Sequence, residues 1–223
     1  MKIDFHVHSK FSRDSLSEPA RLVKMAVRRG LDGFAITDHE TFGAATTARK
    51  AASRLAPDLL VIAGQEICSE YGDILCLFLE REVESRSFDD LVEEVHGQGG
   101  IVALPHMFDS MRKSSLQVGR LSARQVHVLD AVEAFNARTW DDRNNLRAAE
   151  FAASHGKPVI AGSDAHFGFE LGTAFTIVGG PTEKDVKRNI LAGKTFIQGK
   201  PSRFRPFFAH MLTFAAKRAK KFL

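Results

Sequence analysis

Short apolar segments alternate along this chain with longer segments of helical periodicity, and this order restricts the folds open to it. Residues 18–29 show the helical spacing, because Leu22, Val23, Ala26 and Val27 share one helix face. The seven apolar segments are predicted strands, at residues 3–9, 33–37, 59–63, 100–104, 131–135, 158–161 and 173–178. The predicted helices lie at residues 18–29, 46–55, 88–98, 122–129, 142–154 and 183–191. Strands and helices in this order favour a parallel sheet covered by helices.

The alternation is interrupted once, after the third strand. Residues 67–70 and 73–79 meet around Tyr71 and Gly72 and predict an inserted β-hairpin. Seven strand–helix units favour a closed or nearly closed βα barrel over an open sheet. No Gly-x-Gly-x-x-Gly motif opens a helix after any predicted strand, which argues against a dinucleotide-binding fold.

Residue types that bind metals follow six of the predicted strands. His6 and His8 lie two residues apart on the first strand, so their side chains point to the same side. The full set at the strand ends is His6 and His8, Asp38 and His39, Glu66, His106, Asn136, and Asp164 with His166. In a βα barrel these ends open onto one face, and Asp14 follows the first strand onto that face.

Each of these residues also has an ordinary interpretation. On this interpretation Asp38 would cap the next helix and Asp164 would fix a turn. His106 would be a core histidine with its hydrogen bonds made. The coincidence of ligand types at so many strand ends favours a metal site.

The chain resembles the PHP (polymerase and histidinol phosphatase) family. The matching motifs, all between residues 3 and 166, are His6-Val7-His8-Ser9, Thr37-Asp38-His39, Glu66 after the third strand, Pro105-His106 and Gly162-Ser163-Asp164-Ala165-His166. The segment 172–176 is similar to a short extension found in stand-alone members. The resemblance implies an α/β fold, a distorted (β/α)7 TIM-like barrel, which agrees with the strand count.

The resemblance also implies two or three divalent metal ions, zinc, manganese or iron. It assigns His6, His8 and Asp164 to one ion, Glu66 as a bridge to a second with His106, and Asp14, His39 and His166 to a third. Asn136 stands where the family often has a histidine, and Asp14 replaces a histidine of some relatives. Both departures favour a harder ion such as manganese or a weaker second site.

The implied activity is metal-dependent hydrolysis of a small phosphate ester by a metal-activated hydroxide. The substrate is a phosphomonoester, or a nucleotide or short oligonucleotide. Glu66, Asp164, His39 and His166 form the predicted catalytic group as metal ligands, and protonation of a leaving oxygen is an alternative role for His39 or His166. The predicted phosphate-binding residues are Arg138, Lys10 and Arg13. The alternative interpretation is that these three are solvated surface charges with no role in binding.

Two other functions remain open. A metallo-amidohydrolase also begins with His-x-His at the end of a first barrel strand, but here no lysine ends the fourth strand. A non-catalytic metal-binding module is the second alternative, and the nearly complete ligand set argues against it.

Composition divides the 223 residues into a body and a tail. Residues 200–223 hold seven basic and no acidic side chains, which leaves 24 basic and 27 acidic side chains in residues 1–199. We therefore expect a metal-binding barrel domain at residues 1–200 and a basic amphipathic C-terminal tail at 201–223. The tail is expected to be a helix that packs on the barrel or touches an anionic membrane surface.

The remaining composition favours a cytoplasmic protein. The only two cysteines, Cys68 and Cys76, are too few for a disulfide framework and are expected to be reduced thiols. The first residues lack the apolar core of a signal peptide.

Overall fold

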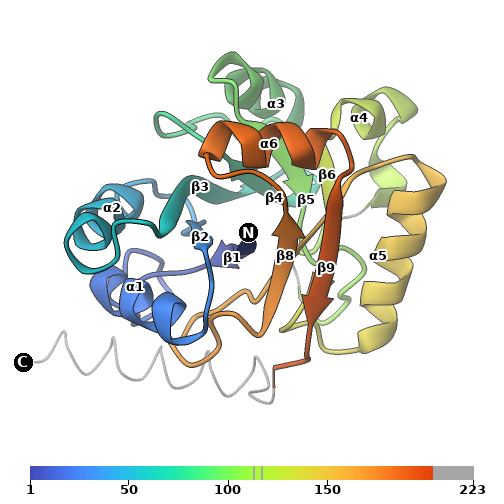
Figure 1. Cartoon of the computed structure of the whole chain (residues 1–223). Coiled ribbons are helices and arrows are strands. Elements are labelled where there is room, and N and C mark those ends of the chain that lie inside the picture. Colours follow the sequence, from blue (N-terminus) through green and yellow to red (C-terminus); the bar gives the residue numbers. More distant parts are fainter. Residues whose placement is uncertain (113, 117, 203–223) are drawn as a thin grey trace, which may run out of the picture.

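The computed structural model describes residues 1–112, 114–116 and 118–202, and within them nine strands form one sheet (Figure 1). The strands are β1 (Lys2–Val7), β2 (Gly33–Ile36), β3 (Leu60–Ser69), β4 (Gly72–Leu77), β5 (Ile101–Leu104), β6 (Ala131–Asn136), β7 (Val159–Gly162), β8 (Ala174–Val178) and β9 (Thr195–Gly199). The helices are α1 (Pro19–Arg28), α2 (Ala44–Leu55), α3 (Phe88–Gly97), α4 (Ala123–Val128), α5 (Asp142–Ser154) and α6 (Glu183–Leu191), with a short 3-10 helix at Val118–Arg120.

The sheet curls into a nearly closed barrel, as the sequence predicts. Its order is β7-β6-β5-β4-β3-β2-β1-β8-β9, and helices surround it (Figure 1). Beyond the end of β7, Ala165 forms a parallel bridge with Val7 and its carbonyl oxygen accepts a hydrogen bond from His8 N at 2.9 Å. The two halves of the sheet therefore meet at the end where the predicted ligands lie.

The predicted hairpin is present and belongs to the barrel wall. β3 continues to Ser69 and turns into β4, which pairs antiparallel with both β3 and β5. Side chains of β4 can therefore face the barrel interior.

The end of the chain differs from the predicted pattern in two ways. The strand expected at 173–178 is present as β8, but it runs antiparallel to β1, whereas the seventh strand of a regular βα barrel would run parallel to it. β9 was not predicted, because its residues are only partly buried and Phe196 is 75% exposed. A half-exposed edge strand of five residues gives no apolar run in the sequence.

The barrel interior is apolar at the amino-terminal ends of the strands. Ile3 and Phe5 of β1 pack there with Leu75, Leu77, Ala103 and other buried side chains. Val186 and Ile190 of α6 belong to the same cluster, so α6 closes this end. The opposite, carboxyl-terminal end is the one left for polar side chains.

A bulge in β1 aims the two histidines of the first strand. Asp4 pairs with Phe34 and Val7 with Ile36, so three steps along β1 oppose two along β2. Phe5 accordingly packs in the barrel interior, whereas Val7 packs in the outer cluster beside α1. The change of face directs the side chains of His6 and His8 inward together.

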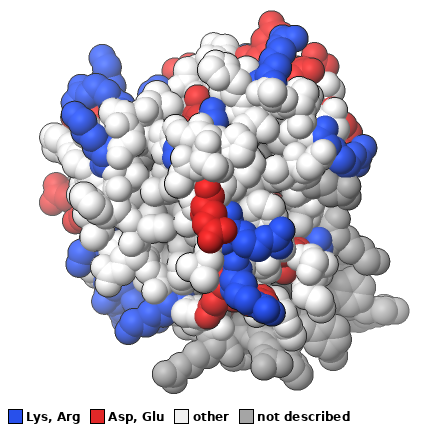
Figure 2. Space-filling view, turned by 90° about the vertical axis from the view of Figure 1, so that its right-hand side faces the viewer, with Lys and Arg blue, Asp and Glu red and all other residues white. Residues whose placement is uncertain are grey.

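Three surface properties bear on the sequence predictions. Within the described residues, the helices are too short or too polar to cross a membrane. Figure 2 shows one face of the molecule, on which small groups of charged side chains, several of them acidic beside basic, lie in mostly uncharged surface. Cys68 and Cys76 are both free thiols, one exposed and one buried.

The cytoplasmic location stays a prediction. The predicted tail helix falls on residues from 203 onward, which lie outside the described residues.

Gly162, the last residue of β7, allows the close approach of β7 to β1. A Cβ atom at this position would collide with the side chain of His6 and lie 2.7 Å from Glu133 Oε1. We predict that Gly162→Ala lowers the free energy of unfolding by about 1–3 kcal/mol, as overpacking does in a rigid core. Urea denaturation in EDTA measures the change.

Gly97→Ala is the matched control, because a Cβ there meets nothing within 4 Å. This variant should keep or slightly raise the stability of the protein. Equal stability of Gly162→Ala and the wild type would contradict the packing described here.

Candidate metal centre

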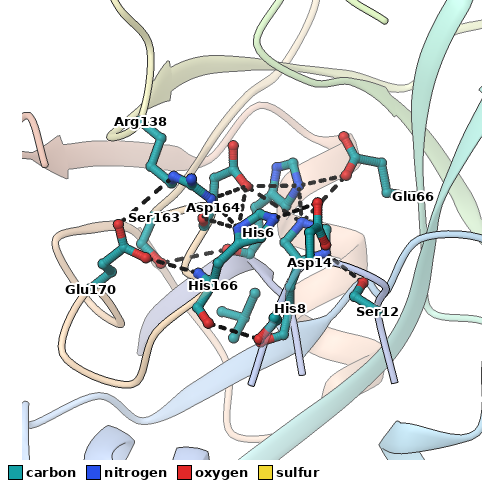
Figure 3. Close-up of polar contacts among 12 residues, drawn as sticks. His6, His8, Ser12, Asp14, Glu66, Arg138, Ser163, Asp164, His166 and Glu170 are labelled. Atoms are coloured by element: carbon teal, nitrogen blue, oxygen red, sulfur yellow. Dashed lines mark hydrogen bonds and ion pairs between the residues drawn. The ribbon is translucent and has the colours of Figure 1, made fainter. Parts of the chain in front are cut away.

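The histidines predicted from the strand ends and the carboxylates other than Asp38 lie in one largely buried cluster, most of which Figure 3 shows. They come from elements far apart in the chain: His6 from β1, Glu66 from β3, and the others from the segments that follow β1, β2, β5 and β7. His6, His8 and Asp164 are fully buried, and Glu66 is 1% exposed. The cluster occupies the carboxyl-terminal end of the barrel, opposite α6.

The donor atoms are spaced like the ligands of metal ions. Nε2 of His6 lies 3.1 Å from Nε2 of His8, and each of the two lies 3.3 Å from Glu66 Oε2. Bonds of about 2.0–2.1 Å in a tetrahedral site place neighbouring ligands about 3.4 Å apart. These donor atoms therefore have the spacing of neighbouring ligands around one metal ion.

Four overlapping groups could each hold an ion among the described residues. They are His8, Asp14, His39 and His166; His6, His106 and Asp164; His6, His8 and Glu66; and Glu66, Asp73 and His106. All predicted ligands except Asn136 are in these groups. Asp73, on β4, was not predicted. Ligation itself stays a prediction for every residue.

Two members of the cluster hold a backbone conformation that favours glycine. Asp164 has φ of 54° and His106 has φ of 27°. Such positive φ values cost roughly 1–3 kcal/mol in residues with a side chain and concentrate at functional sites. The surrounding structure holds both side chains in place against this cost.

Glu133 orients two of the histidines from behind and was not predicted as part of the site. Its carboxylate accepts from His6 Nδ1 at 3.0 Å and from the backbone N of His106 at 2.8 Å. A proton on Nδ1 leaves Nε2 of His6 as the free donor for a metal. The available signal was a single acidic residue inside the apolar strand 131–135.

Asn136 is engaged in hydrogen bonds at both ends of its amide. Its Oδ1 accepts from Arg138 N at 2.9 Å, and its Nδ2 donates to Glu133 at 2.9 Å and to Asp164 Oδ2 at 3.3 Å. The partners fix the orientation of the amide, since a flip would set donor against donor and oxygen against oxygen. Its role as a metal ligand stays a prediction.

The cluster contains buried polar atoms that suit a cation. Asp164 Oδ1 lies 3.4 Å from His8 Nε2, while Oδ2 pairs with Arg112 NH1 at 2.7 Å. Among the described residues, neither Asp164 Oδ1 nor His106 Nδ1 has a hydrogen-bond partner, although both atoms are buried. Buried polar atoms are rarely left so, and a divalent ion would satisfy the carboxylate oxygen. The donor set therefore fits the metals that the resemblance implies.

Electrostatic coupling shifts the pKa values of the cluster strongly. Burial opposes the change, but contacts with Asp164 and Glu66 raise the pKa of His8 to about 9. Against the effect of burial, His39 and His6 hold the pKa of Glu66 well below its usual value. Burial and the charge of Arg138 lower the pKa of His166 to about 3, so this histidine is neutral. The network as a whole mixes protonated and neutral imidazoles around ionised carboxylates.

The three predicted phosphate-binding residues lie in different settings. Lys10 is on the surface and pairs with Glu18 at 2.8 Å, and Arg13 is exposed. Arg138 is 2% exposed and lies against His166 Nδ1, with NH1 3.3 Å from the carbonyl oxygen of Asp164 (Figure 3). The structure thus gives Arg138 the position of a support for His166, and phosphate binding by all three stays a prediction.

Arg112 is a cation of the site that was not predicted. It pairs with Asp164 as described above, and its Nε lies 3.2 Å from the buried Asp109 Oδ2. It belongs to the loop after β5, whose sequence has no periodic pattern from which its direction could be predicted. Asp38, by contrast, accepts from Ser9 N and Oγ at 2.5 and 2.6 Å and fixes the first loop.

Comparisons with known proteins agree with this geometry. A family model of the PHP domain matches residues 4–123, and a PHP-associated model matches residues 142–195. The uncharacterised protein MJ0417 of Methanocaldococcus jannaschii is 34% identical over 181 residues, which are 78% of this chain and 69% of that protein.

Solved structures share the fold at low identity. A two-domain protein from Bacteroides vulgatus that contains a predicted PHP-like metal-dependent phosphoesterase aligns with a TM-score of 0.76 and 20% identity, over 90% of this chain and 65% of that one. This chain thus spans about two thirds of that protein. An amidohydrolase from Chromobacterium violaceum with bound sulfate aligns with a TM-score of 0.62 and 16% identity, over 93% and 95% of the two chains.

Metal binding should release protons at neutral pH. His8, with a pKa of about 9 in the absence of metal, is protonated at pH 7, whereas a metal requires its neutral form. We predict release of at least about one proton per protein on addition of Mn²⁺ at pH 7, and less release as the pH rises through 9. Calorimetric titration in buffers of different ionisation enthalpy measures the number.

His155→Ala should release as many protons as the wild type, because His155 is exposed at the end of α5. His8→Ala should release fewer. Equal heats in all buffers at pH 7 would contradict the coupling of His8 to the carboxylates.

Proposed function

We propose that this chain, which belongs to the PHP domain family, is a metal-dependent phosphoesterase that hydrolyses a small phosphate ester. The observation that supports this most directly is the buried cluster in which His6, His8 and Glu66 offer donor atoms 3.1–3.3 Å apart. Families of this kind use adjacent divalent ions to act on phosphate oxygens. The fold likeness to a PHP-like protein agrees with the assignment.

Two or three ions of zinc, manganese or iron would occupy the cluster. His6, His8, Glu66 and Asp164 would hold one, Glu66 and His106 would share in a second, and Asp14, His39 and His166 would hold a third. When bound, the ions supply Lewis acidity and lower the pKa of water. A site of mixed nitrogen and oxygen ligands accepts zinc, manganese or iron.

The chain itself supplies a cation for the substrate phosphate. Arg112 is 81% buried at its side chain and is held between Asp109 and Asp164. The planar guanidinium binds phosphate oxygens through paired N–H groups. Its NH2 is buried and has no hydrogen-bond partner among the described residues, and a phosphate oxygen beside it would satisfy this group. We therefore place Arg112 ahead of Lys10 and Arg13 as the phosphate-binding residue.

His39 is better suited than His166 to protonate a leaving oxygen. Burial opposes the change, but the nearby charge of Glu66 and the contact with Asp14 raise the pKa of His39, whereas His166 is neutral with a pKa of about 3. His39 is also 18% exposed at its side chain, which lets substrate approach it. Both histidines remain first of all metal-ligand candidates.

Exposed aromatic side chains favour a substrate with an organic ring. Phe11, Trp140 and Phe169 are 42–47% exposed and lie in segments that follow β1, β6 and β7. The segments after these parallel strands lie on the side of the barrel where the cluster opens. Aromatic side chains stack on nucleobases, so a nucleotide or a short oligonucleotide fits this rim.

A long nucleic acid is a poorer fit. Residues 1–199 hold more acidic than basic side chains, and the face in Figure 2 carries no continuous basic strip. Binding along a phosphate backbone relies on such strips. The substrate class proposed is therefore a small phosphorylated molecule.

A substrate panel tests the function and separates it from its alternatives. We predict that the metal-reconstituted wild type releases phosphate from a nucleotide, an oligonucleotide or a sugar or amino-alcohol phosphate. Asp164→Ala and His8→Ala should abolish this release while circular dichroism shows an intact fold, because each removes a predicted ligand. Amide cleavage without phosphate release would indicate an amidohydrolase, and metal binding with neither activity would indicate a binding module.

Substitution of Arg112 tests its proposed contact with phosphate. Arg112→Gln should weaken competitive inhibition by inorganic phosphate by about tenfold or more, since a hydrogen bond to a charged group is worth about 1.5–3 kcal/mol. Arg120→Gln, at an exposed arginine near Tyr71, is the matched control and should leave inhibition unchanged. An unchanged inhibition constant in Arg112→Gln would show that Arg112 does not touch the phosphate.

A further inference from the structure

The position around His106 and Glu66 lacks a third ligand in the assignment made from the sequence. His106 Nε2 lies 2.7 Å from Glu66 Oε1, so the two side chains are close enough to bind the same ion. Asn136 stands where the family often has a histidine, but its amide oxygen already accepts from Arg138 N. Its nitrogen donates to Glu133 and Asp164, so ligation through this residue would disturb an amide held by partners on both sides.

Asp73 reaches the same position from the inserted strand β4. It pairs with Cys68 across the β3–β4 ladder, two positions along from the pair of Glu66 with Leu75. Leu75 packs in the barrel interior, and Asp73, two residues before it, faces the same way. Donor atoms of Asp73, Glu66 and His106 lie within 4.8 Å of one another.

Burial makes this carboxylate costly unless a cation is near. Asp73 is 4% exposed. Donor oxygens of Asp73 and Glu66 lie within 4.8 Å of each other, so two buried carboxylates share one region of low dielectric. A divalent ion would offset the repulsion between the two carboxylates.

We propose that Asp73, and not Asn136, is the third protein ligand of the metal position formed by Glu66 and His106. The position then has two carboxylates and one imidazole, a donor set that suits manganese or iron better than zinc. The inference rests on the proposed function only in that the cluster binds divalent ions. It gives the inserted hairpin a function, since β4 carries a ligand into the barrel.

Metal titration of the full chain tests the assignment. The protein is stripped with EDTA and titrated with Mn²⁺ by calorimetry, as wild type, Asp73→Asn, Asn136→Ala and Asp109→Asn. Loss of a residue that only supports a ligand weakens binding by about 10–100-fold, so loss of a ligand should exceed that range. We expect Asp73→Asn to lose one equivalent of Mn²⁺ or to bind it more than about 100-fold more weakly.

The other variants serve as controls for burial and charge. Asp109 is an equally buried carboxylate that contacts Arg112, and Asp109→Asn should keep every equivalent. Asn136→Ala should also keep every equivalent. Full stoichiometry in Asp73→Asn, with a loss of affinity under about 100-fold, would overturn the proposal. A merely structural Asp73, which holds Ser114 beside β4, would give that result.

A second measurement does not depend on how well Asp73→Asn folds. A cysteine thiolate bound to Co²⁺ gives a charge-transfer band in the near ultraviolet. Asp73→Cys should gain this band on addition of Co²⁺ under reducing conditions, and Asn136→Cys should match the wild type, which carries Cys68 and Cys76. Co²⁺ bound to Asp73→Cys without a new band would overturn the proposal.

The outcomes also separate this proposal from the proposed function. A wild type that binds Mn²⁺ through Asp73 but hydrolyses no phosphate ester would refute the function alone. A phosphoesterase whose Asp73→Asn variant binds every ion normally would refute the ligand alone. A wild type that binds no divalent ion would overturn both.

Discussion

The mutual proximity of buried imidazoles and carboxylates is the constraint on which the rest of this structure depends. His8 Nε2 lies 3.3 Å from Glu66 Oε2 and 3.4 Å from Asp164 Oδ1, and none of the three residues is more than 1% exposed. Buried ionisable groups are stable only when they are paired or bind a metal. Protons on the histidines balance the carboxylates without metal, and bound divalent ions would take over that role. The pKa of about 9 for His8 reflects the first of these two situations, in which a proton on the histidine balances the nearby carboxylates.

Several features of the fold hold the buried histidines and carboxylates close together. One end of the barrel is closed by an apolar cluster that includes Val186 and Ile190 of α6, so polar side chains gather at the other end. The bulge in β1 turns two histidines inward, and positive φ angles at His106 and Asp164 aim two further side chains. Glu133 and Arg138 then support the histidines from behind. Strain and buried charge are concentrated in the place where the function is proposed.

Much of the fold and most of the ligand-type residues could be predicted from the sequence, because barrel geometry sends every parallel strand end to one face. His6 and Glu66 could be brought together from their places at or just after the ends of predicted strands. β9 could not be predicted, because a half-exposed edge strand has no apolar run, and the antiparallel direction of β8 is set by the sheet as a whole. Glu133, Arg112 and Asp73 were missed because each acts from within a strand or from an irregular loop, where local sequence does not give the direction of a side chain. Contacts across the barrel decide the direction of these side chains.

Anomalous X-ray diffraction from crystals of the full chain loaded with manganese measures the central feature directly. We expect two or three anomalous peaks inside the cluster, about 2.0–2.3 Å from donor atoms of His6, His8, Glu66 and their neighbours. Peaks confined to the protein surface, or histidines and carboxylates that point away from one another around an ion-free cluster, would contradict it.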